Sequence, residues 1–260
     1  MEKTAKLVSC LLPAGDSPAH TARAILCYQR QTWQHKELIV LDNGLQDLTP
    51  LLEDIPDSEL RYVHMPPGTF ASHASLKNRG LDEAGGDYVI HWDPSDWHHP
   101  DRIRYQIAGF EDGVQISWLS AVLLHIDHPE FVHHPYKDQS KSGYMGSLMH
   151  VNDPQKRYPD NHSKSEKAFL DKWDPAVTGM LDTEYSWLMI HGMTGDNKNR
   201  RRFLAGLRGN SGDAARLLWL KMRGRNRLAH SRFRLSDLER DSFQKYLQES
   251  SRLGVLTSIS

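Results

Sequence analysis

In the first half of the chain, short apolar runs alternate with helical patterns, and this alternation constrains the fold more than any other feature. The apolar runs, each of strand length, cover residues 7–12, 37–42, 60–64 and 87–92. Helical patterns follow at residues 72–84 and 100–110, and another begins at Asp16-Ser17-Pro18, where a capping residue precedes a proline. Strands separated by helices form parallel sheets with right-handed crossovers. We therefore predict an α/β fold with a mostly parallel sheet flanked by helices.

The second half of the sequence is more mixed. We predict one or two strands over residues 114–126, further strands over 146–151 and 185–191, and a helix over 165–173. Residues 200–250 are basic and amphipathic and read as helical. The domains we expect are therefore a main unit over residues 1–195 and a basic helical C-terminal region over 196–260 that packs on it.

Composition excludes several classes of protein. With 260 residues, 38% of them hydrophobic and 25% charged, the chain is an ordinary globular sequence that can bury a sizeable core. Two cysteines, Cys10 and Cys27, lie among apolar residues and cannot form a disulfide framework. The sequence shows neither an apolar run of about 20 residues nor a secretory signal at its start. We expect a cytoplasmic protein.

Charge is distributed unevenly along the chain. Residues 1–195 hold 17 Lys and Arg against 27 Asp and Glu, a net charge of −10, whereas residues 196–240 hold 13 against 4, a net charge of +9. Such a basic region is either a solvated helical face or a contact for anionic lipid headgroups, a phosphorylated ligand or nucleic acid. No nucleic-acid motif accompanies it, so peripheral contact with the inner face of a membrane is the partner we favour.

Polar, mostly acidic loops follow three of the predicted strands. They begin at Pro13, Asp42 and Asp93, and the last of them also holds Asp96. Ligands of parallel α/β sheets bind beyond the carboxyl ends of the strands. We therefore expect these loops to converge on one binding rim.

Five segments, in order, resemble the family-2 glycosyltransferases, which have the nucleotide-diphospho-sugar transferase (GT-A) fold. The segments are LVSCLLPAGDSP, QTW followed by KELIVLDNG, ASLKNRGLDEAGGDYVIHWDPSDWHHPDRI, GSLMHVNDPQKRYPD followed by KSEKAF, and MIHGMTGDN. They run from about residue 7 to about residue 195. The resemblance implies an enzyme that moves a sugar from a nucleotide donor, a uridine diphosphate (UDP) sugar by preference, to an acceptor hydroxyl with inversion. The acceptor it implies is a glycan, a lipid-linked saccharide or a protein.

The same resemblance assigns roles to individual residues and implies a divalent cation, Mn²⁺ or Mg²⁺, that stabilises the leaving diphosphate. Glu166 is the first acid of the family's acidic pair, whose second acid is the usual base. Since Lys167 stands at that second position, we expect Glu166 to act as the general base. The expected nucleotide contacts are Pro13, Asp42, Lys77, Asn78 and Asp93, with Asp42 at the base and Lys77 beside phosphate. The expected metal ligands are Asp93, Asp96 and His191.

Three departures from the family pattern leave a second hypothesis open. Ala14-Gly15 offers no aromatic ring to stack on the base, and Ser95 replaces the second carboxylate of the D-x-D motif. Lys167 stands where the family carries its usual base, and a protonated lysine accepts no proton. The alternative to an active transferase is therefore a degenerate module of the same fold that binds a nucleotide or a saccharide without catalysis.

Overall fold

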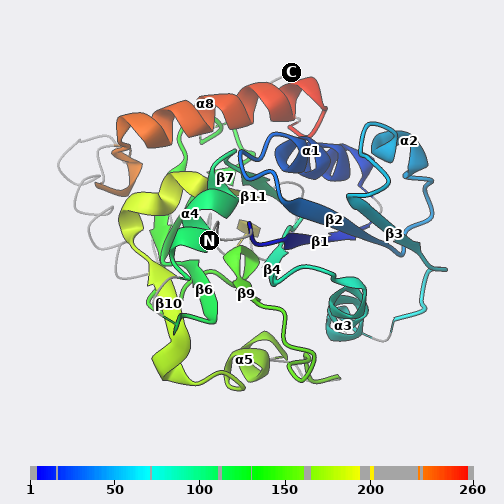
Figure 1. Cartoon of the computed structure of the whole chain (residues 1–260). Helices are drawn as coiled ribbons and strands as arrows, with labels where there is room; N and C mark the ends of the chain where they lie inside the picture. The colour runs from blue at the N-terminus through cyan, green and yellow to red at the C-terminus, as the bar shows by residue number, and fades with distance from the viewer. Residues whose placement is uncertain are drawn as a thin grey trace.

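The computed structural model describes residues 5–15, 17–70, 72–110, 113–129, 131–160, 165–193, 200–201, 228 and 231–256. Its larger sheet has seven strands in the order β10-β6-β9-β4-β1-β2-β3 (Figure 1). These strands are β1 (Val8–Ala14), β2 (Lys36–Asp42), β3 (Leu60–His64), β4 (Tyr88–His91), β6 (Ile116–Leu119), β9 (Met149–Val151) and β10 (Thr178–Leu181). Strands β1 to β4 pair in parallel, and β9 runs antiparallel to β4 and β6. The prediction of an α/β fold with a mostly parallel sheet is confirmed.

A second sheet, which the sequence did not predict, stands beside the first. It has four strands in the order β5-β11-β7-β8, namely β5 (Asp96–His98), β11 (Met189–Met193), β7 (Ala121–Ile126) and β8 (Tyr136–Gln139). Strand β5 is antiparallel to β11, and their register sets Asp96 opposite His191. The second sheet thus joins the loop after β4 to a strand that lies about 95 residues further along the chain.

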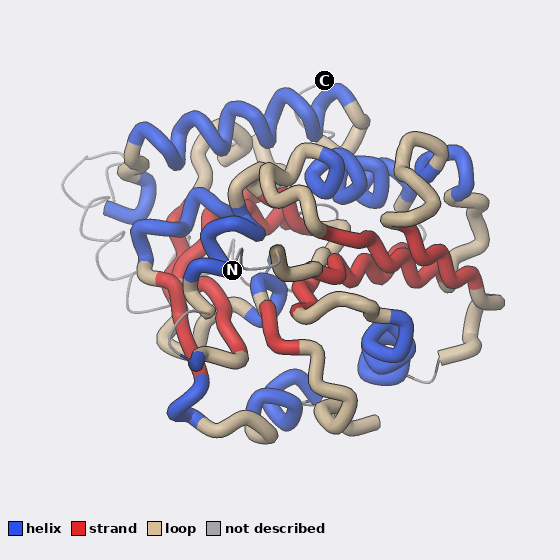
Figure 2. Tube along the Cα trace, in the orientation of Figure 1, coloured by secondary structure: helices blue, strands red, loops and turns tan. Residues whose placement is uncertain are grey.

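The helices cover both faces of the large sheet (Figures 1 and 2). They are α1 (Pro18–Gln29), α2 (Thr49–Leu52), α3 (His73–Glu83), α4 (Arg102–Ala108), α5 (Ser165–Leu170) and α8 (Asp237–Arg252). Helices α1, α2 and α8 lie on one side, and α3 and α5 lie on the other. Gly80 lets α3 pack closely, because a Cβ atom there would lie 2.0 Å from Cδ1 of Leu11 in β1.

Successive side chains of the central strands point to opposite faces of the sheet, so each face has its own hydrophobic core. Cys10 and Leu12 of β1 join a cluster with side chains of α1 and α8, whereas Leu11 joins a second cluster with α3 and α5. Both clusters are buried, as expected for parallel strands that helices cover on both sides. Helix α8 contributes Phe243 and Tyr246 to the first cluster, so the C-terminal helix shares the core of the sheet.

Two predicted strands begin later than expected. Of residues 185–191, the part up to 188 belongs to a 3₁₀ helix, Thr183–Leu188, and β11 starts only at Met189. Of residues 146–151, the first belong to a 3₁₀ turn, Met145–Ser147, that precedes β9. Short apolar runs are buried in either conformation, so periodicity alone does not separate the two.

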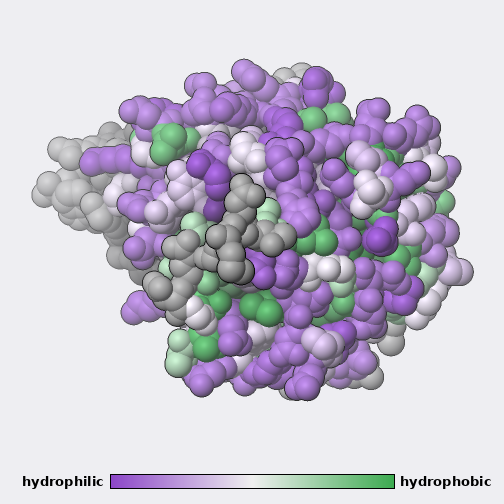
Figure 3. Space-filling model, viewed as in Figure 1, coloured by the Kyte–Doolittle hydropathy of each residue, from purple (hydrophilic) through white to green (hydrophobic). Residues whose placement is uncertain are grey.

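The C-terminal region is described only in part. Most of the basic stretch 196–240 lies outside the described residues, so the domain boundary and the membrane contact stay predictions. Helix α8 begins with a capping box in which Ser236 and Glu239 bind each other's backbone amides. Across the face drawn in Figure 3, side chains are mostly hydrophilic, and the apolar ones form small separate areas. In the described part of the chain, no helix combines the length and the hydropathy needed to cross a membrane.

Candidate functional site

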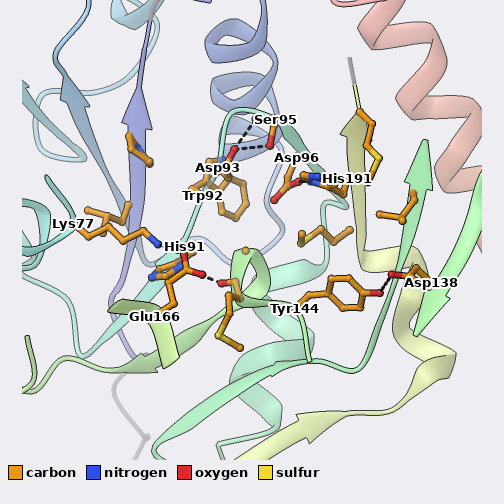
Figure 4. A pocket seen from close by; sticks show the side chains of 17 residues that line it. Lys77, His91, Trp92, Asp93, Ser95, Asp96, Asp138, Tyr144, Glu166 and His191 are labelled. Carbon is orange, nitrogen blue, oxygen red and sulfur yellow. Dashed lines mark hydrogen bonds and ion pairs between the residues drawn. The ribbon is translucent and has the colours of Figure 1, made fainter. Parts of the chain in front are cut away.

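A pocket of about 570 Å³ opens at the carboxyl ends of β1 and β4 (Figure 4). The second sheet, helices α3 and α5 and the segment 144–146 form the rest of its wall. Of the residues predicted from the sequence, those that line the pocket are Pro13, Lys77, Asp93, Asp96, Glu166 and His191. The fold therefore gathers, in one cavity, side chains that are spread over nearly 180 positions of the chain.

Asp93 and Ser95 form a tight turn directly after β4. The Oδ1 atom of Asp93 accepts hydrogen bonds from the backbone amide of Ser95 at 2.8 Å and from its hydroxyl at 2.6 Å. The amide of Asp96 donates to the carbonyl of Asp93 at 3.0 Å. Such side-chain-to-backbone bonds are typical of an Asx turn. Oδ1 takes both bonds from Ser95, and among the described residues no hydrogen bond reaches the second carboxylate oxygen of Asp93.

Asp96 and His191 form a charged pair on the wall beside this turn. The Nδ1 atom of His191 lies 2.5 Å from Oδ1 of Asp96, whose side chain is buried. Burial raises the pKa of Asp96, although His191 opposes the shift. Burial alone would lower the pKa of His191, but the Asp96 carboxylate outweighs it, and the pKa is raised. Each of the two side chains therefore favours the charged form of the other.

Lys77 and Glu166 meet on the other side of the pocket. The Lys77 ammonium lies 2.7 Å from Oε1 of Glu166 and 5.2 Å from the centre of the Tyr158 ring. Glu166 stands in the first turn of α5 with 48% of its side chain exposed. The next residue, Lys167, is exposed and does not line the pocket. Of these two neighbours, only the carboxylate faces the cavity.

A third polar pair was missed by the sequence analysis. Asp138 of β8 and Tyr144, which precedes the 3₁₀ turn Met145–Ser147, both line the pocket (Figure 4). The Tyr144 hydroxyl donates to Oδ2 of Asp138, whose Oδ1 accepts from Arg232 at 3.2 Å. Burial and the neighbouring carboxylate raise the pKa of Tyr144. No sequence signal identifies this pair, because β8 is short and polar, and because Arg232, which binds Asp138, lies 94 residues away along the chain.

Two predicted nucleotide contacts lie outside the pocket lining. Asp42 is buried at the end of β2, where it accepts from the Tyr62 hydroxyl at 2.7 Å and the Gly44 amide at 2.9 Å, and contacts His64 Nδ1 at 2.9 Å. The Asn78 amide exchanges two hydrogen bonds, of 2.8 and 2.7 Å, with the backbone of Tyr158. Both side chains thus hold neighbouring segments in place, and their contacts with a nucleotide stay predictions.

The donor atoms of Asp93, Asp96 and His191 suit a divalent cation in type, since Mg²⁺ and Mn²⁺ prefer oxygen ligands and Mn²⁺ also accepts imidazole. Within the described ranges, however, no three His, Cys, Asp or Glu side chains are grouped so that they hold a metal ion by themselves. A cation that one or two carboxylates share with phosphate oxygens and water needs no such group. The residues therefore fit a cation that is held jointly with a phosphorylated ligand.

The fold and the comparisons define the class of this protein. Among solved structures, *S. aureus* TarS 1–349 in complex with UDP aligns over 96% of this chain and 83% of its own, with a TM-score of 0.56 and 13% identity. Glucosyl-3-phosphoglycerate synthase from Mycobacterium tuberculosis, in complex with Mn²⁺, UDP and glucosyl-3-phosphoglycerate, aligns over 85% of this chain and 81% of its own, with a TM-score of 0.51 and 15% identity. At such identities the likeness concerns the fold, which is that of the GT-A glycosyltransferases.

The family follows from the sequence comparison. The model of Glycosyl transferase family 2 matches residues 9–176, well over half of the chain. The chain belongs to this family.

Two curated relatives match a shorter segment. An uncharacterized glycosyltransferase of Haemophilus influenzae is 28% identical over 102 residues, 39% of this chain and 41% of that protein. The amylovoran biosynthesis glycosyltransferase AmsB of Erwinia amylovora is 26% identical over 106 residues, 40% of this chain and 35% of its own. The match therefore spans less than half the length of either relative.

Proposed function

We propose that this glycosyltransferase moves a sugar from a nucleoside diphosphate donor, a UDP-sugar by preference, to an acceptor hydroxyl with inversion. One observation carries the proposal: Lys77, Glu166, Asp93 and the Asp96–His191 pair all line the same pocket at the strand ends. Two of the similar solved structures, TarS 1–349 and glucosyl-3-phosphoglycerate synthase, are complexes with UDP, which supports the choice of nucleotide. The acceptor classes we retain are a glycan, a lipid-linked saccharide and a protein.

In the proposed reaction, Glu166 accepts the proton of the acceptor hydroxyl. The acceptor oxygen attacks the anomeric carbon from the face opposite the diphosphate, so the new C–O bond forms as the bond to the diphosphate oxygen breaks. This single displacement inverts the anomeric centre. Lys77 contributes a positive charge for the phosphate oxygens as negative charge develops on them.

Asp93 and Asp96, with His191 beside them, are the residues that would hold a divalent cation together with the donor. When bound, the cation would neutralise charge on the diphosphate. Support comes from the Mn²⁺ in the glucosyl-3-phosphoglycerate synthase complex and from the carboxylate oxygen of Asp93 that Ser95 leaves open. Because Ser95 replaces a carboxylate, we expect this cation to bind weakly.

The second candidate function is a non-catalytic module that binds a nucleotide or saccharide in the same pocket. One observation favours it: the carboxylate of Glu166 is already neutralised by Lys77 at 2.7 Å. While this ion pair persists, the Glu166 oxygen that faces Lys77 binds the ammonium and not the hydroxyl of an acceptor.

The experiment that tests the proposal combines binding and turnover. Calorimetry with UDP and adenosine diphosphate, with and without Mn²⁺, measures whether the pocket prefers uridine. Release of UDP from a panel of UDP-sugars, with simple glycosides as acceptors, measures transfer. Preferential UDP binding with UDP release supports the transferase, whereas binding without release from any donor supports the module. Equal affinity for both nucleotides contradicts the uridine assignment.

A further inference from the structure

Arg23 of α1 is a fully buried cation behind the Asp93–Ser95 turn. Its exposed fraction is 0%, and its guanidinium makes no ion pair with any carboxylate in the described part of the chain. Its Nη2 atom donates to the carbonyl oxygens of Pro94 at 3.2 Å and Ser95 at 2.8 Å. Burying a charge without a counterion costs free energy, and these hydrogen bonds offset part of that cost.

The carbonyl of Ser95 is where the turn, α1 and β11 meet. Besides the bond from Arg23, this oxygen accepts the amide of Gly192 at 3.2 Å, and Gly192 directly follows His191. A Cβ atom on Gly192 would lie 3.2 Å from the same oxygen. Both sides of the candidate donor site, the Asp93 turn and the strand that carries His191, are therefore fixed to one backbone atom.

Helix α8 holds Arg23 from the other side. The Nη1 atom of Arg23 donates to the Ser250 hydroxyl at 3.0 Å, and its guanidinium lies 5.3 Å from the centre of the Tyr246 ring. Tyr246 is fully buried, and its hydroxyl hydrogen-bonds His125 at 2.8 Å. A helix more than 220 residues away in the sequence thus sets the position of the cation behind the turn.

We propose that Arg23 is a positioning residue, through which helix α8 fixes the Asp93–Asp96 turn in the geometry that binds the donor. Arg23 lines no part of the pocket and acts only through the carbonyls of Pro94 and Ser95. The C-terminal helix is then a component of the donor site. The inference rests on the proposed function for its effect on nucleotide binding, but the ordering of the turn is measured independently of that function.

Arg30 supplies a matched control for the simpler explanation, that Arg23 only docks α8. It belongs to the same helix-to-helix interface, since it follows α1 and its Nη2 atom donates to Oε2 of Glu249 in α8 at 2.6 Å. Glu249 precedes Ser250, the partner of Arg23, but Arg30 makes no hydrogen bond to the turn. Removing either arginine should weaken the docking of α8, but only removing Arg23 should release the turn.

The test compares Arg23→Met, Arg23→Lys and Arg30→Met in the full chain. Hydrogen–deuterium exchange of the amides of residues 92–96 reports the turn, calorimetry reports UDP affinity, and thermal unfolding reports stability. Trp97 is left out of this segment because its indole donates to Oε2 of Glu249, the partner of Arg30, at 2.7 Å. We expect both Met variants to unfold at lower temperature. Only Arg23→Met should speed amide exchange in the turn. It should also weaken the binding of UDP about tenfold, which is the effect of losing one hydrogen bond to a charged group. Arg23→Lys should recover part of the protection.

Equal exchange in the turn of Arg23→Met and Arg30→Met would overturn the positioning role. If Arg23→Met does not fold, Arg23→Lys against Arg30→Lys gives the same comparison with the charge kept. If the unmutated protein binds no UDP, the proposed function fails, and the exchange rates still decide whether Arg23 orders the turn. Altered exchange with unchanged UDP affinity would overturn the link between α8 and donor binding.

Discussion

The ammonium of Lys77 and the carboxylate of Glu166 meet at 2.7 Å in the pocket, although 89 residues separate them in the sequence. Lys77 is only 14% exposed, whereas Glu166 is 48% exposed. A diphosphate that enters the pocket competes with Glu166 for the lysine, because both are anions. In the proposed reaction, donor binding then leaves the Glu166 carboxylate free to accept a proton from the acceptor.

Replacing Lys77 with methionine should weaken UDP binding. The variant loses a charge-assisted hydrogen bond of about 1.5–3 kcal/mol, which corresponds to about 10- to 150-fold in the dissociation constant measured by calorimetry. Lys167→Met is the control, since this lysine is exposed and outside the pocket. A similar loss of affinity in both variants would show that only overall charge matters.

The identity of the general base is decided by Glu166→Gln against Lys167→Asp. Glutamine keeps the shape of the side chain but accepts no proton, so transfer should fall by about 10²- to 10⁴-fold in a UDP-release assay. Lys167→Asp should leave the rate nearly unchanged, because position 167 does not line the pocket. If the unmutated protein is inactive and Lys167→Asp gains activity, the chain is a degenerate transferase.

Ser95→Asp should tighten Mn²⁺ binding. The variant replaces the hydroxyl that donates to Asp93 at 2.6 Å with a second carboxylate, and a divalent cation relieves the repulsion between the two. The rise in unfolding temperature on adding Mn²⁺, measured with UDP present, should therefore be larger in the variant. An unchanged response would mean that this turn is not a cation site.

The part of the fold that the sequence could predict is the part in which local patterns and burial agree. Strands β1 to β4 and helix α3 were predicted because continuous apolar runs and a capping serine, Ser72, act over a few residues. Strands β5, β8 and β10 were not predicted, because three or four residues of mixed polarity have no measurable period. Strands β5 and β10 form because β11 and β6, which lie far from them in the sequence, pair with them. Strand β8 forms because it pairs with β7, the strand before it in the chain.

The same limit applies to the candidate site. Asp93 and Glu166 were found because each lies in a motif of the family, and both line the pocket. The Tyr144–Asp138 pair was not found because it lies in a short polar segment without a periodic pattern, although the two residues are only six positions apart. The buried Arg23 was not found because its partner Ser250 is 227 residues away. Asp42 was predicted by its place at a strand end, but its packing against Tyr62 depends on tertiary structure.

Asp42→Ala tests base recognition and stability together. The substitution leaves the Tyr62 hydroxyl and the Gly44 amide without their buried acceptor, which should cost about 1–3 kcal/mol in the free energy of unfolding. If Asp42 also binds the base, the preference for UDP over adenosine diphosphate disappears in calorimetry. Tyr62→Phe is the control, because it removes one hydrogen bond and keeps the carboxylate. Loss of selectivity in the control as well would assign the effect to packing.

Acid should destabilise the protein through buried histidines, of which His150 is the clearest. Its ring is 1% exposed, and it packs beside Phe169 and Trp173. Burial lowers the pKa of His150 to about 4, although the carbonyl of Val151 opposes the shift. An unfolded histidine has a pKa of about 6.5, so between pH 6.5 and 4 the unfolded state holds a proton that the folded state lacks.

The free energy of unfolding should therefore fall as the pH decreases through this window, by up to about 1.4 kcal/mol per pH unit for this one side chain. His150→Phe removes the titrating group and also an Nε2 atom that is buried without a partner in the structure. Urea unfolding at pH 7.5, 6 and 5 should show a smaller loss of stability in the variant than in the unmutated protein. The comparison uses the difference between pH values, so a constant offset from repacking around the larger ring does not affect it. Parallel pH dependences would mean that His150 holds the same number of protons in both states, and the acid sensitivity would then belong to other buried histidines such as His125, whose pKa is also lowered by burial to about 4.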